Sequence, residues 1–326
     1  MDAIDGQILH ALQIAPRVPF RRIADIIGVD EQTVARRYRA LRRDGALRVV
    51  GVVNPGVYGE CQWIVRVHAK PDDLLRLAEA LVRRAEVTHA NVLSGGTELV
   101  CVIRARVSDA GDGLLNRLPR TSAVTDVRIN LILHVFGTHA DAHWTGHGHG
   151  LDTQRIAALQ PDDDPYPARP VAPAADDQVL LDALADDGRA SDSALARLTG
   201  WSPARVKRRL GALQASGSLT YDLDLLPERL GFMMNAMIWI STMPRHLASV
   251  AERIARHDEV ASVAAVSGPT NLMVVVICRD TEHLYRYLAE RLGAVDHVQA
   301  YEVSVRSKRL KQVGSLVSHG RLIRAG

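Results

Sequence analysis

Apolar positions in the first 45 residues recur with the period of an α-helix in three successive stretches. Ile4, Ile8 and Leu12 lie four residues apart and form the buried stripe of a first helix. The next stripe predicts a second helix that ends at Gly28, and a third stripe begins after the N-cap residue Asp30. Three short helices with tight connections predict a small helical domain.

The same pattern occurs again near the middle of the chain, shifted by 172 residues. A small residue, a glycine four positions later and an apolar residue six beyond it are what two closely crossing helices require. The sequence therefore predicts two helix–turn–helix motifs. Three pairs of matched residues share the offset: Ala24 and Ala196, Gly28 and Gly200, and Val34 and Val206.

A second repeated pattern follows each helical triplet. Alternating apolar residues and helical stripes predict the order strand, helix, strand, strand, helix, strand in both halves. In the first half the predicted strands are 62–69, 87–93, 99–107 and 124–135, and in the second half 233–240, 260–266, 272–278 and 295–305. The strand at 232–240 is apolar at every position except Asn235, which indicates burial on both faces.

These patterns predict an α+β chain with two copies of a helix–turn–helix domain, each followed by a ferredoxin-like βαββαβ domain. The β-rich pieces 46–53 and 218–225 fit either a wing or a linker strand. The expected domains are 1–53 and 176–225 for the helix–turn–helix units, 60–137 and 231–307 for the ferredoxin-like units, 138–175 for a linker and 308–326 for a basic tail.

Glycine, proline and histidine dominate the predicted linker, so we expect it to be extended or partly disordered. His139, His143 and His147 are spaced four residues apart, as metal ligands on a helix would be. Gly146, Gly148 and Gly150 disfavour a helix there, and a polar linker is the better interpretation.

Composition narrows the setting of the protein. The 326 residues are 47% hydrophobic and carry a net charge of only +3, so affinity for nucleic acid must come from local groups of Lys and Arg. Cys61, Cys101 and Cys278 form no CxxC pair, which indicates inert thiols in a reducing compartment. The acidic N-terminus is unlike a signal peptide, and the apolar run 272–278 is too short to span a bilayer. We therefore expect a cytoplasmic protein without membrane contact.

The third helix of each triplet exposes a row of basic and polar residues opposite its buried stripe. Arginine can bind guanine O6 and N7 in a bidentate manner or clamp phosphates, and the first residues of such a helix reach the bases. A solvated charged face is the alternative for any arginine run, but within this motif we favour DNA. The candidate DNA-binding residues are Gln32, Thr33, Arg36, Arg37, Arg43, Ser202, Arg205, Lys207, Arg208 and Arg209. The two helices differ at their first positions, so we expect two non-identical half-sites, an imperfect palindrome.

The arrangement resembles the Lrp/AsnC (feast/famine) family of transcription regulators. The resemblance is carried by the 5–12 segment, by Ile23-Ala24 to Gly28, by the 34–37 segment and by their second-half counterparts, of which 200–202 and 206–210 are the clearest. Members usually carry one such unit and dimerise, whereas here two units share one chain. The resemblance implies that the two ferredoxin-like domains pair within one molecule as a pseudo-dimer, and that homo-oligomers are built from these pseudo-dimers.

The resemblance also implies a small effector, commonly an amino acid, bound at the turns between the second and third strands. An ordinary hairpin turn, where glycine only supplies positive φ, is an equally good interpretation of the same residues. Glu98 could receive an amino group, whereas Asn271 is neutral, so we expect one site to have lost or changed its ligand. The candidate effector residues are Gly95, Gly96, Thr97, Glu98, Gly268, Thr270 and Asn271.

The sequence therefore predicts a DNA-binding regulator that is not an enzyme and needs no cofactor, with double-stranded DNA and a small effector as partners. An alternative is an enzyme, because a branch of the same fold resembles sirohaem decarboxylases. Those enzymes use His and Arg near the second strand to hold carboxylates, and here 87–91 offers only His89. A third, weaker interpretation is an architectural protein that bends or bridges DNA.

Overall fold

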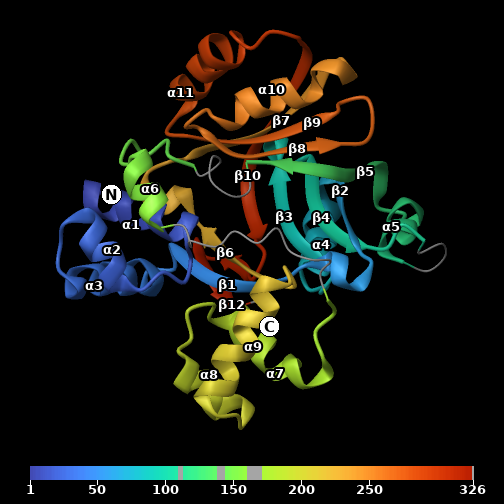
Figure 1. Ribbon diagram of the computed structural model, residues 1–326. Helices are drawn as coiled ribbons and strands as arrows, with labels where there is room; N and C mark the ends of the chain where they lie inside the picture. The colour runs from blue at the N-terminus through green and yellow to red at the C-terminus, as the bar shows by residue number, and fades with distance from the viewer. Residues whose placement is uncertain (109–112, 138–143, 160–170, 325–326) are drawn as a thin grey trace.

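The computed structural model describes residues 1–108, 113–137, 144–159 and 171–324 (Figure 1). Both predicted helix–turn–helix units are present. In each, the second helix ends at a glycine with positive φ, 77° at Gly28 and 71° at Gly200, which allows the sharp turn before the third helix. The first unit consists of α1 (Ala3–Ile14), α2 (Phe20–Ile27) and α3 (Glu31–Arg43), and the second of α7 (Gln178–Asp186), α8 (Asp192–Thr199) and α9 (Pro203–Ala215).

A two-stranded ribbon joins the two helix–turn–helix units. The piece after each unit, for which a wing and a linker strand were both open, forms a strand: β1 (Leu47–Val53) and β6 (Leu219–Leu225). These strands pair antiparallel with each other along their whole length, with Val50 opposite Asp222. The second unit is therefore attached to the first by a continuous hydrogen-bonded ladder.

Two arginines at matched positions add a reciprocal contact between the units. Arg17 donates from Nη1 to the carbonyl of Gly188 at 2.6 Å, and Arg189 donates from Nη1 to the carbonyl of Pro16 at 2.6 Å. The two arginines are 172 residues apart, so the equivalent arginine of each copy donates to the loop after the first helix of the other copy. Together with the ribbon, this contact fixes the two units relative to each other.

The two predicted βαββαβ units are also present. Their strands follow the orders β5-β2-β4-β3 and β10-β7-β9-β8, with helices on the outer face of each sheet (Figure 1). The first unit contains β2 (Cys61–Ala69), α4 (Pro71–Val82), β3 (Val87–Leu93), β4 (Glu98–Ala105), α5 (Leu114–Arg117) and β5 (Val124–Phe136). The second contains β7 (Met234–Thr242), α10 (Leu247–Ala255), β8 (Val260–Val266), β9 (Leu272–Cys278), α11 (Thr281–Arg286) and β10 (Val298–Lys311).

The long last strand of each unit crosses into the sheet of the other unit. β5 pairs with β2 and then with β8, while β10 pairs with β7 and then with β3. The eight strands thereby close into a ring, which removes the exposed edges of both sheets. The pairing of the two units within one molecule, expected from the sequence, is thus made by two equivalent strand joints.

The apolar strand β7 shows why the two sheets face each other. Ile238 and Ile240 pack against the helices of the second unit, while Met237 and Trp239 point into the ring. Trp239 is 1% exposed and contributes to an interior cluster with residues of both units, among them Ile64 of β2. Both faces of the strand are buried, as its composition predicted.

The expected linker is folded over much of its described length, which corrects the expectation of an extended connector. Residues 144–159, here called the strap, include α6 (Thr153–Leu159) and pack on α1 and α2. Trp144 is 1% exposed and meets Phe232 edge-on, with ring centroids 4.7 Å apart. Thr145 donates to Asp258 at 2.7 Å, so the strap also ties the first helix–turn–helix unit to the second βαββαβ unit. His139 and His143, of the proposed metal triplet, lie outside the described residues.

The segment expected to form a basic tail extends the sheet in its described part, up to residue 324. β10 runs to Lys311, and β11 (Ser315–Ser318) and β12 (Arg321–Arg324) extend the sheet beyond it. Leu322 donates its N–H to the carbonyl of Gly45, which places the last hairpin beside the end of α3. Among the described helices, none has the length and apolar character needed to cross a membrane.

Candidate nucleic-acid interface and effector turns

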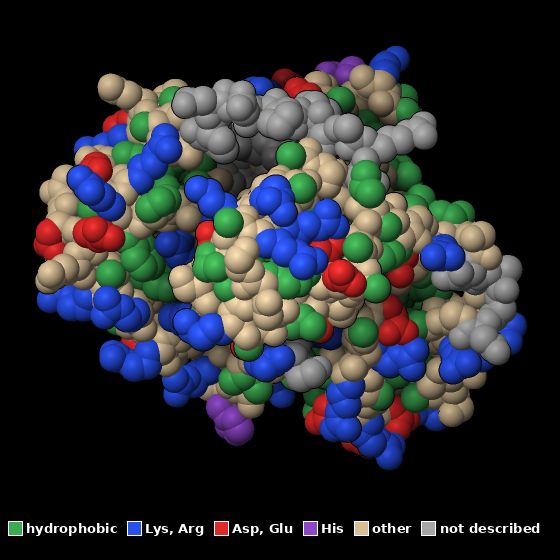
Figure 2. Space-filling model, turned by 60° about the horizontal axis from the view of Figure 1, so that its bottom comes forward, with side chains coloured by type: hydrophobic (Ala, Val, Ile, Leu, Met, Phe, Trp, Pro, Cys, Tyr) green, Lys and Arg blue, Asp and Glu red, His purple; other side chains and the backbone are tan. Residues whose placement is uncertain are grey.

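The third helix of each helix–turn–helix unit presents, at the same place, an exposed arginine that makes no hydrogen bond or salt bridge within the described residues. Asp30 caps α3 by accepting the N–H of Thr33 at 2.7 Å, and Ser202 caps α9 by accepting the N–H of Arg205 at 3.3 Å. Arg36 and its counterpart Arg208 are exposed on the outer faces of these capped helices. Figure 2 looks at the side of the molecule where both units lie, and Lys and Arg side chains are spread in several groups over it. Gln32, Lys207 and Arg43 are exposed as well.

The neighbouring arginine in each copy has a different environment. Arg37 Nη1 lies 2.6 Å from Asp2 and 2.8 Å from Asp5, both on or before α1. Arg209 pairs in the same way with Asp177, which is 2% exposed. Hydrogen bonding to Arg209 holds the pKa of the Asp177 carboxyl below its ordinary value. Each of these two arginines therefore ties the third helix to the first while its side chain stays partly exposed, and a DNA contact from either one stays a prediction.

Three other predicted DNA-binding residues also make contacts within the protein. Thr33 donates its hydroxyl to Asp30 at 2.7 Å, and Ser202 serves as a cap. The guanidinium of Arg205 stacks on Trp201 at 4.1 Å from the ring centroid. Because these contacts lie at exposed helix starts, the three side chains remain on the same surface as Arg36 and Arg208.

Both predicted effector turns lie where the two βαββαβ units are joined. Gly95 donates its N–H to Ser307 of β10 at 3.1 Å. On the other side, Ser267 accepts from the N–H of Leu131 of β5 through its hydroxyl at 2.8 Å. Gly95, Gly96 and Gly268 have φ of 69°, 95° and 108°, so each turn requires glycine for its backbone. The two sites are therefore equivalent in place, as the repeat predicts.

The polar residues of these turns are already engaged. Glu98 is 1% exposed and receives Arg66 Nε at 2.5 Å and the hydroxyl of Ser304 at 2.9 Å. The Arg66 guanidinium lies 4.3 Å from the centre of the Trp239 ring. Asn271 closes its own turn by exchanging two hydrogen bonds with the backbone of Thr242, at 3.0 and 2.8 Å. In this arrangement Glu98 is not open to the amino group that the sequence analysis assigned to it. Thr97 caps its own turn by donating to Ser94 at 2.9 Å, while Thr270 is half-buried.

A charged cluster that the sequence analysis did not identify lies at one joint of the ring. Where β10 pairs with β3, Arg306 stands opposite Leu93 and Arg309 opposite Asn91, on the inner face. Arg309 donates to Glu228 at 3.3 Å, and Asn235 donates to the same carboxylate at 3.1 Å. Only the strand register brings these residues together, because they come from four separate segments of the chain.

Histidine 89 belongs to the same inner face, two residues before Asn91 on β3. Burial, with the positive charges of Arg309 and Arg306 nearby, lowers the pKa of His89 to about 4. Its ring is therefore neutral near pH 7. The strand of His89 itself contains no arginine. Arg306 and Arg309, which lie near His89, come from β10 of the other unit.

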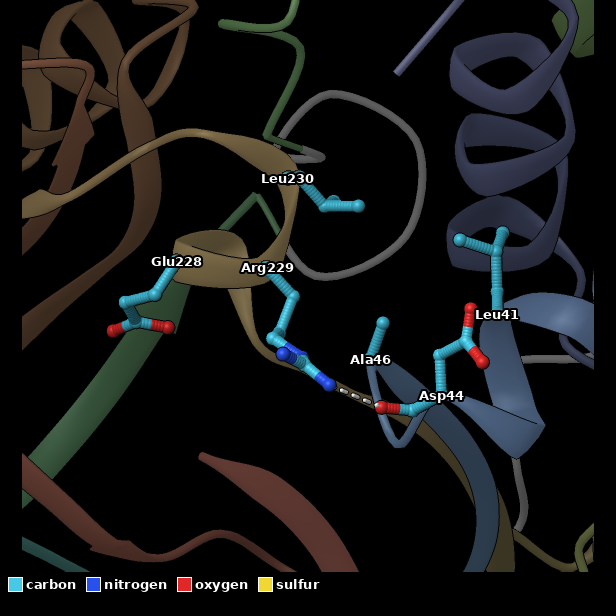
Figure 3. A pocket seen from close by; sticks show the side chains of 6 residues that line it. All are labelled: Leu41, Asp44, Ala46, Glu228, Arg229 and Leu230. Atoms are coloured by element: carbon cyan, nitrogen blue, oxygen red, sulfur yellow. Dashed lines mark hydrogen bonds between the residues drawn. The ribbon is translucent and has the colours of Figure 1, made fainter. Parts of the chain in front are cut away.

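Beside this cluster an open pocket of about 420 Å³ lies between the end of α3 and the turn Pro227–Leu230 (Figure 3). Arg229 crosses it and donates from Nη2 to the carbonyl of Asp44 at 3.0 Å. Glu228 points away from Leu41 and Asp44, toward the ring. The turn therefore contacts the charged cluster through one residue and the end of α3 through the next.

Family models match both helix–turn–helix units and one βαββαβ unit. The AsnC-type helix–turn–helix domain matches residues 1–42 and 175–214, and the Lrp/AsnC ligand binding domain matches 235–316, so that together they cover half of the chain. The chain belongs to the Lrp/AsnC family. Its two helix–turn–helix matches and its closed pair of βαββαβ units identify it as a tandem form of an Lrp/AsnC protein.

Curated relatives correspond to one unit of this tandem Lrp/AsnC chain. The HTH-type transcriptional regulator LrpA of Pyrococcus abyssi is 28% identical over 136 residues, which is 41% of this chain and 96% of the relative. The HTH-type transcriptional regulator AldR of Mycolicibacterium smegmatis is 29% identical over 144 residues, 43% of this chain and 84% of the relative. The solved siroheme decarboxylase NirDL shares the fold of the whole chain, with a TM-score of 0.60 and 14% identity over 96% of this chain and 93% of that chain.

Proposed function

We propose that this Lrp/AsnC chain is a sequence-specific DNA-binding transcriptional regulator whose two recognition helices, α3 and α9, read successive half-sites. The observation that carries the proposal is the matched pair Arg36 and Arg208. Both are exposed and make no hydrogen bond or salt bridge within the described residues, while the next arginine in each copy is held by an aspartate. A surface kept only for solubility would not need the same free arginine at the same place twice.

The two helices would read related but different sequences. Gln32 stands where the second copy has Ala204, and Thr33 stands where it has Arg205. Glutamine favours adenine in the major groove and arginine favours guanine, so these positions would distinguish the half-sites. An imperfect palindrome is therefore the expected target, and chromosomal DNA as the partner would place the protein in the cytoplasm.

A small effector, such as an amino acid, would modulate DNA binding from the region where the βαββαβ units join. Support for this part comes from the ligand-binding family match and from the equivalent positions of the two turns at the joints. Homo-oligomers of the whole chain, assembled from these joined units, would place several recognition helices on one DNA.

The DNA proposal is tested with a double variant, Arg36→Ala with Arg208→Ala, on the DNA region upstream of the protein's own gene. We expect at least a tenfold loss of affinity in a gel-shift titration, because two base or phosphate contacts are removed. Arg256→Ala with Arg286→Ala removes the same charge from exposed positions on the second βαββαβ unit and should bind like the unmodified chain. Equal affinity of both variants would reject α3 and α9 as the DNA-reading helices.

A second candidate is a sirohaem decarboxylase-like enzyme, since the fold of NirDL matches this chain across both units. His89, with Arg306 and Arg309 beside it, would be the group that holds carboxylates. The free Arg36 and Arg208 favour the regulator, because an enzyme has no use for them. An absorbance titration with sirohaem separates the two: a saturable spectral change would support the enzyme, and an unchanged spectrum would reject it.

A further inference from the structure

The two joints of the strand ring pair equivalent strands but have different inner faces. At the β5–β8 joint, Ile132 stands opposite Val266 and Val135 opposite Ala264. At the equivalent β10–β3 joint, the corresponding residues are Arg306 opposite Leu93 and Arg309 opposite Asn91. The first joint shows that apolar side chains alone can close the ring, so the arginines of the second joint are not needed to build the fold.

Arginines at this place are costly for the folded chain. Arg306 Nε and Nη1 and Arg309 Nε are buried and have no partner among the described residues. A charged group that is buried without enough partners destabilises the folded state of a protein. Burial beside Arg309 lowers the pKa of Arg306 to about 9, which reflects the same cost. A protein retains such destabilising groups where they bind another molecule when the protein functions.

The counter-charges nearby do not balance the two guanidinium groups. Glu228 contacts Arg309 through one carboxylate oxygen, and its other oxygen, Oε2, is also without a partner among the described residues. Asp224 is the other carboxylate near Arg309, but burial raises its pKa to about 7, and it already accepts the N–H of Gly314 at 3.1 Å. The side-chain oxygens of Asn91 and Asn235 are unpartnered as well, within the described part of the chain.

We propose that the β10–β3 joint is a binding site for a small molecule that carries an oxyanion, a carboxylate or a phosphate, together with at least one hydrogen-bond donor. The unpartnered N–H groups of Arg306 and Arg309 donate hydrogen bonds to the oxyanion, as guanidinium groups do in charge-assisted pairs. The oxygens of Asn91, Asn235 and Glu228 accept from a hydroxyl or ammonium group of the same molecule. The ligand is small because Trp239, Leu93 and their neighbours fill the rest of the ring.

The site is connected to the first recognition helix. Glu228, which pairs with Arg309, is followed by Arg229, which holds the carbonyl of Asp44, and Asp44 is the C-cap residue of α3. Leu230 of the same turn packs in the core of the first helix–turn–helix unit. An anion that takes Arg309 from Glu228 moves this turn and with it the end of α3. This second part rests on the proposed DNA-binding function, whereas the binding site itself does not.

Binding is tested by thermal unfolding of the full chain with sodium phosphate, succinate or malate, each compared with sodium chloride at equal ionic strength. We expect at least one of the three to raise Tm by about 3 °C or more near saturation. A larger rise in Tm with phosphate than with the two dicarboxylates would indicate a phosphate ligand. A larger rise with malate than with succinate would indicate that the hydroxyl group of malate donates a hydrogen bond in the site. A response no larger than that to sodium chloride for all three anions would overturn the site.

The matched variant copies the apolar joint into the charged one: Arg306→Ile with Arg309→Val. Because the other joint is stable with these residues, we expect this variant to fold with a Tm at or above that of the unmodified chain and to lose the response to the anion. Lys308→Ala with Arg256→Ala removes the same charge from exposed positions and should keep the response. A response that survives in the Arg306/Arg309 variant would overturn the assignment.

The connection to α3 is tested separately, by DNA affinity with and without the anion that raises Tm. We expect a change of at least threefold in the unmodified chain and none in Arg229→Ala, which should still show the thermal response. Unchanged affinity in the unmodified chain would overturn the connection while leaving the binding site in place. If the chain binds no DNA at all, the proposed function fails, and the thermal measurement still decides whether the anion site exists.

Discussion

At the scale of single residues, the duplicated arginine doublet has divided its work in the same way in both halves. Arg37 pairs with Asp5 and Arg209 with Asp177, and these two aspartates are themselves 172 residues apart. The preceding arginine of each doublet is exposed. The pattern of one arginine for the fold and one for the surface has therefore been kept since the duplication.

This division predicts different effects of two neighbouring substitutions. Arg37→Ala removes a partly buried guanidinium that pairs with two aspartates, so we expect the free energy of unfolding to fall by about 1 kcal/mol, screening by solvent included. Arg36→Ala removes no contact among the described residues and should change stability by less than about 0.5 kcal/mol. Urea unfolding of the two single variants measures the difference.

For DNA affinity we expect the opposite order of the two single variants: Arg36→Ala should bind DNA more weakly than Arg37→Ala. If Arg37→Ala instead unfolds like the unmodified chain and loses DNA affinity, then Arg37 reads DNA and its aspartates are only resting partners. The repeated motif in the sequence predicts that this surface binds DNA. It could not separate the two arginines, because helical spacing places both near the edge of the buried stripe and says nothing of a carboxylate on another helix.

At the scale of elements, the repeat predicted almost every helix and strand, since each one has its own apolar period. The strap was missed because its buried residues, Trp144, Leu151 and Leu159, stand among glycines, histidines and other polar residues without any period. They pack into the core of the first helix–turn–helix unit, together with Phe232. Gly6 of α1 shows how closely the strap lies, because a Cβ there would come within 2.6 Å of the His149 Cβ.

Protonation of His147 tests whether the strap is packed in solution. Burial lowers the pKa of His147 from 6.5 to about 4, so between these pH values the unfolded chain binds a proton that the folded chain does not. The contribution of a neutral His147 is therefore present above pH 6.5 and is lost as the pH falls toward 4. We expect the stability advantage of the unmodified chain over His147→Gln to shrink by about 1–3 kcal/mol between pH 7 and pH 4.5.

Denaturant unfolding of both proteins at the two pH values provides the measurement. The comparison within a pair matters, because His89 shifts stability in the same direction and Asp224 in the opposite one, and both contributions cancel in the difference. A difference between the two proteins that stays constant with pH would mean that His147 is solvated and that the strap is detached.

At the scale of the whole molecule, the sequence predicted that the two βαββαβ units pair, but not how. An open dimer of two sheets would satisfy the same apolar strands. The closed ring depends on β10 running six residues beyond the predicted end at 305, into a segment that is mostly basic and shows no apolar period of a strand. The charged joint between β10 and β3 follows from this extension, which is why the sequence analysis could not locate Arg306 and Arg309 together.

The whole chain also sets the distance between the two recognition helices. The β1–β6 ribbon and the reciprocal contacts of Arg17 and Arg189 join the helix–turn–helix units without a free tether. A rigid pair can bind both half-sites at once only if they lie at one spacing and on one face of the duplex. Inserting 5 base pairs between the half-sites turns one of them to the opposite face, and we expect affinity to fall at least tenfold through the loss of bivalent binding.

Anisotropy titrations with the native spacing and with 5 and 10 added base pairs measure this effect. Because a rigid pair also has a fixed reach, 10 added base pairs should restore little of the affinity, although they return the half-site to the original face. The double variant Arg17→Ala with Arg189→Ala loosens the contact between the two units. Its ratio of affinity for the DNA with 10 added base pairs to affinity for the native spacing should therefore be higher than that of the unmodified chain. Equal affinity of the unmodified chain for all three DNAs would show that the two units move independently, and the ribbon would then be a hinge.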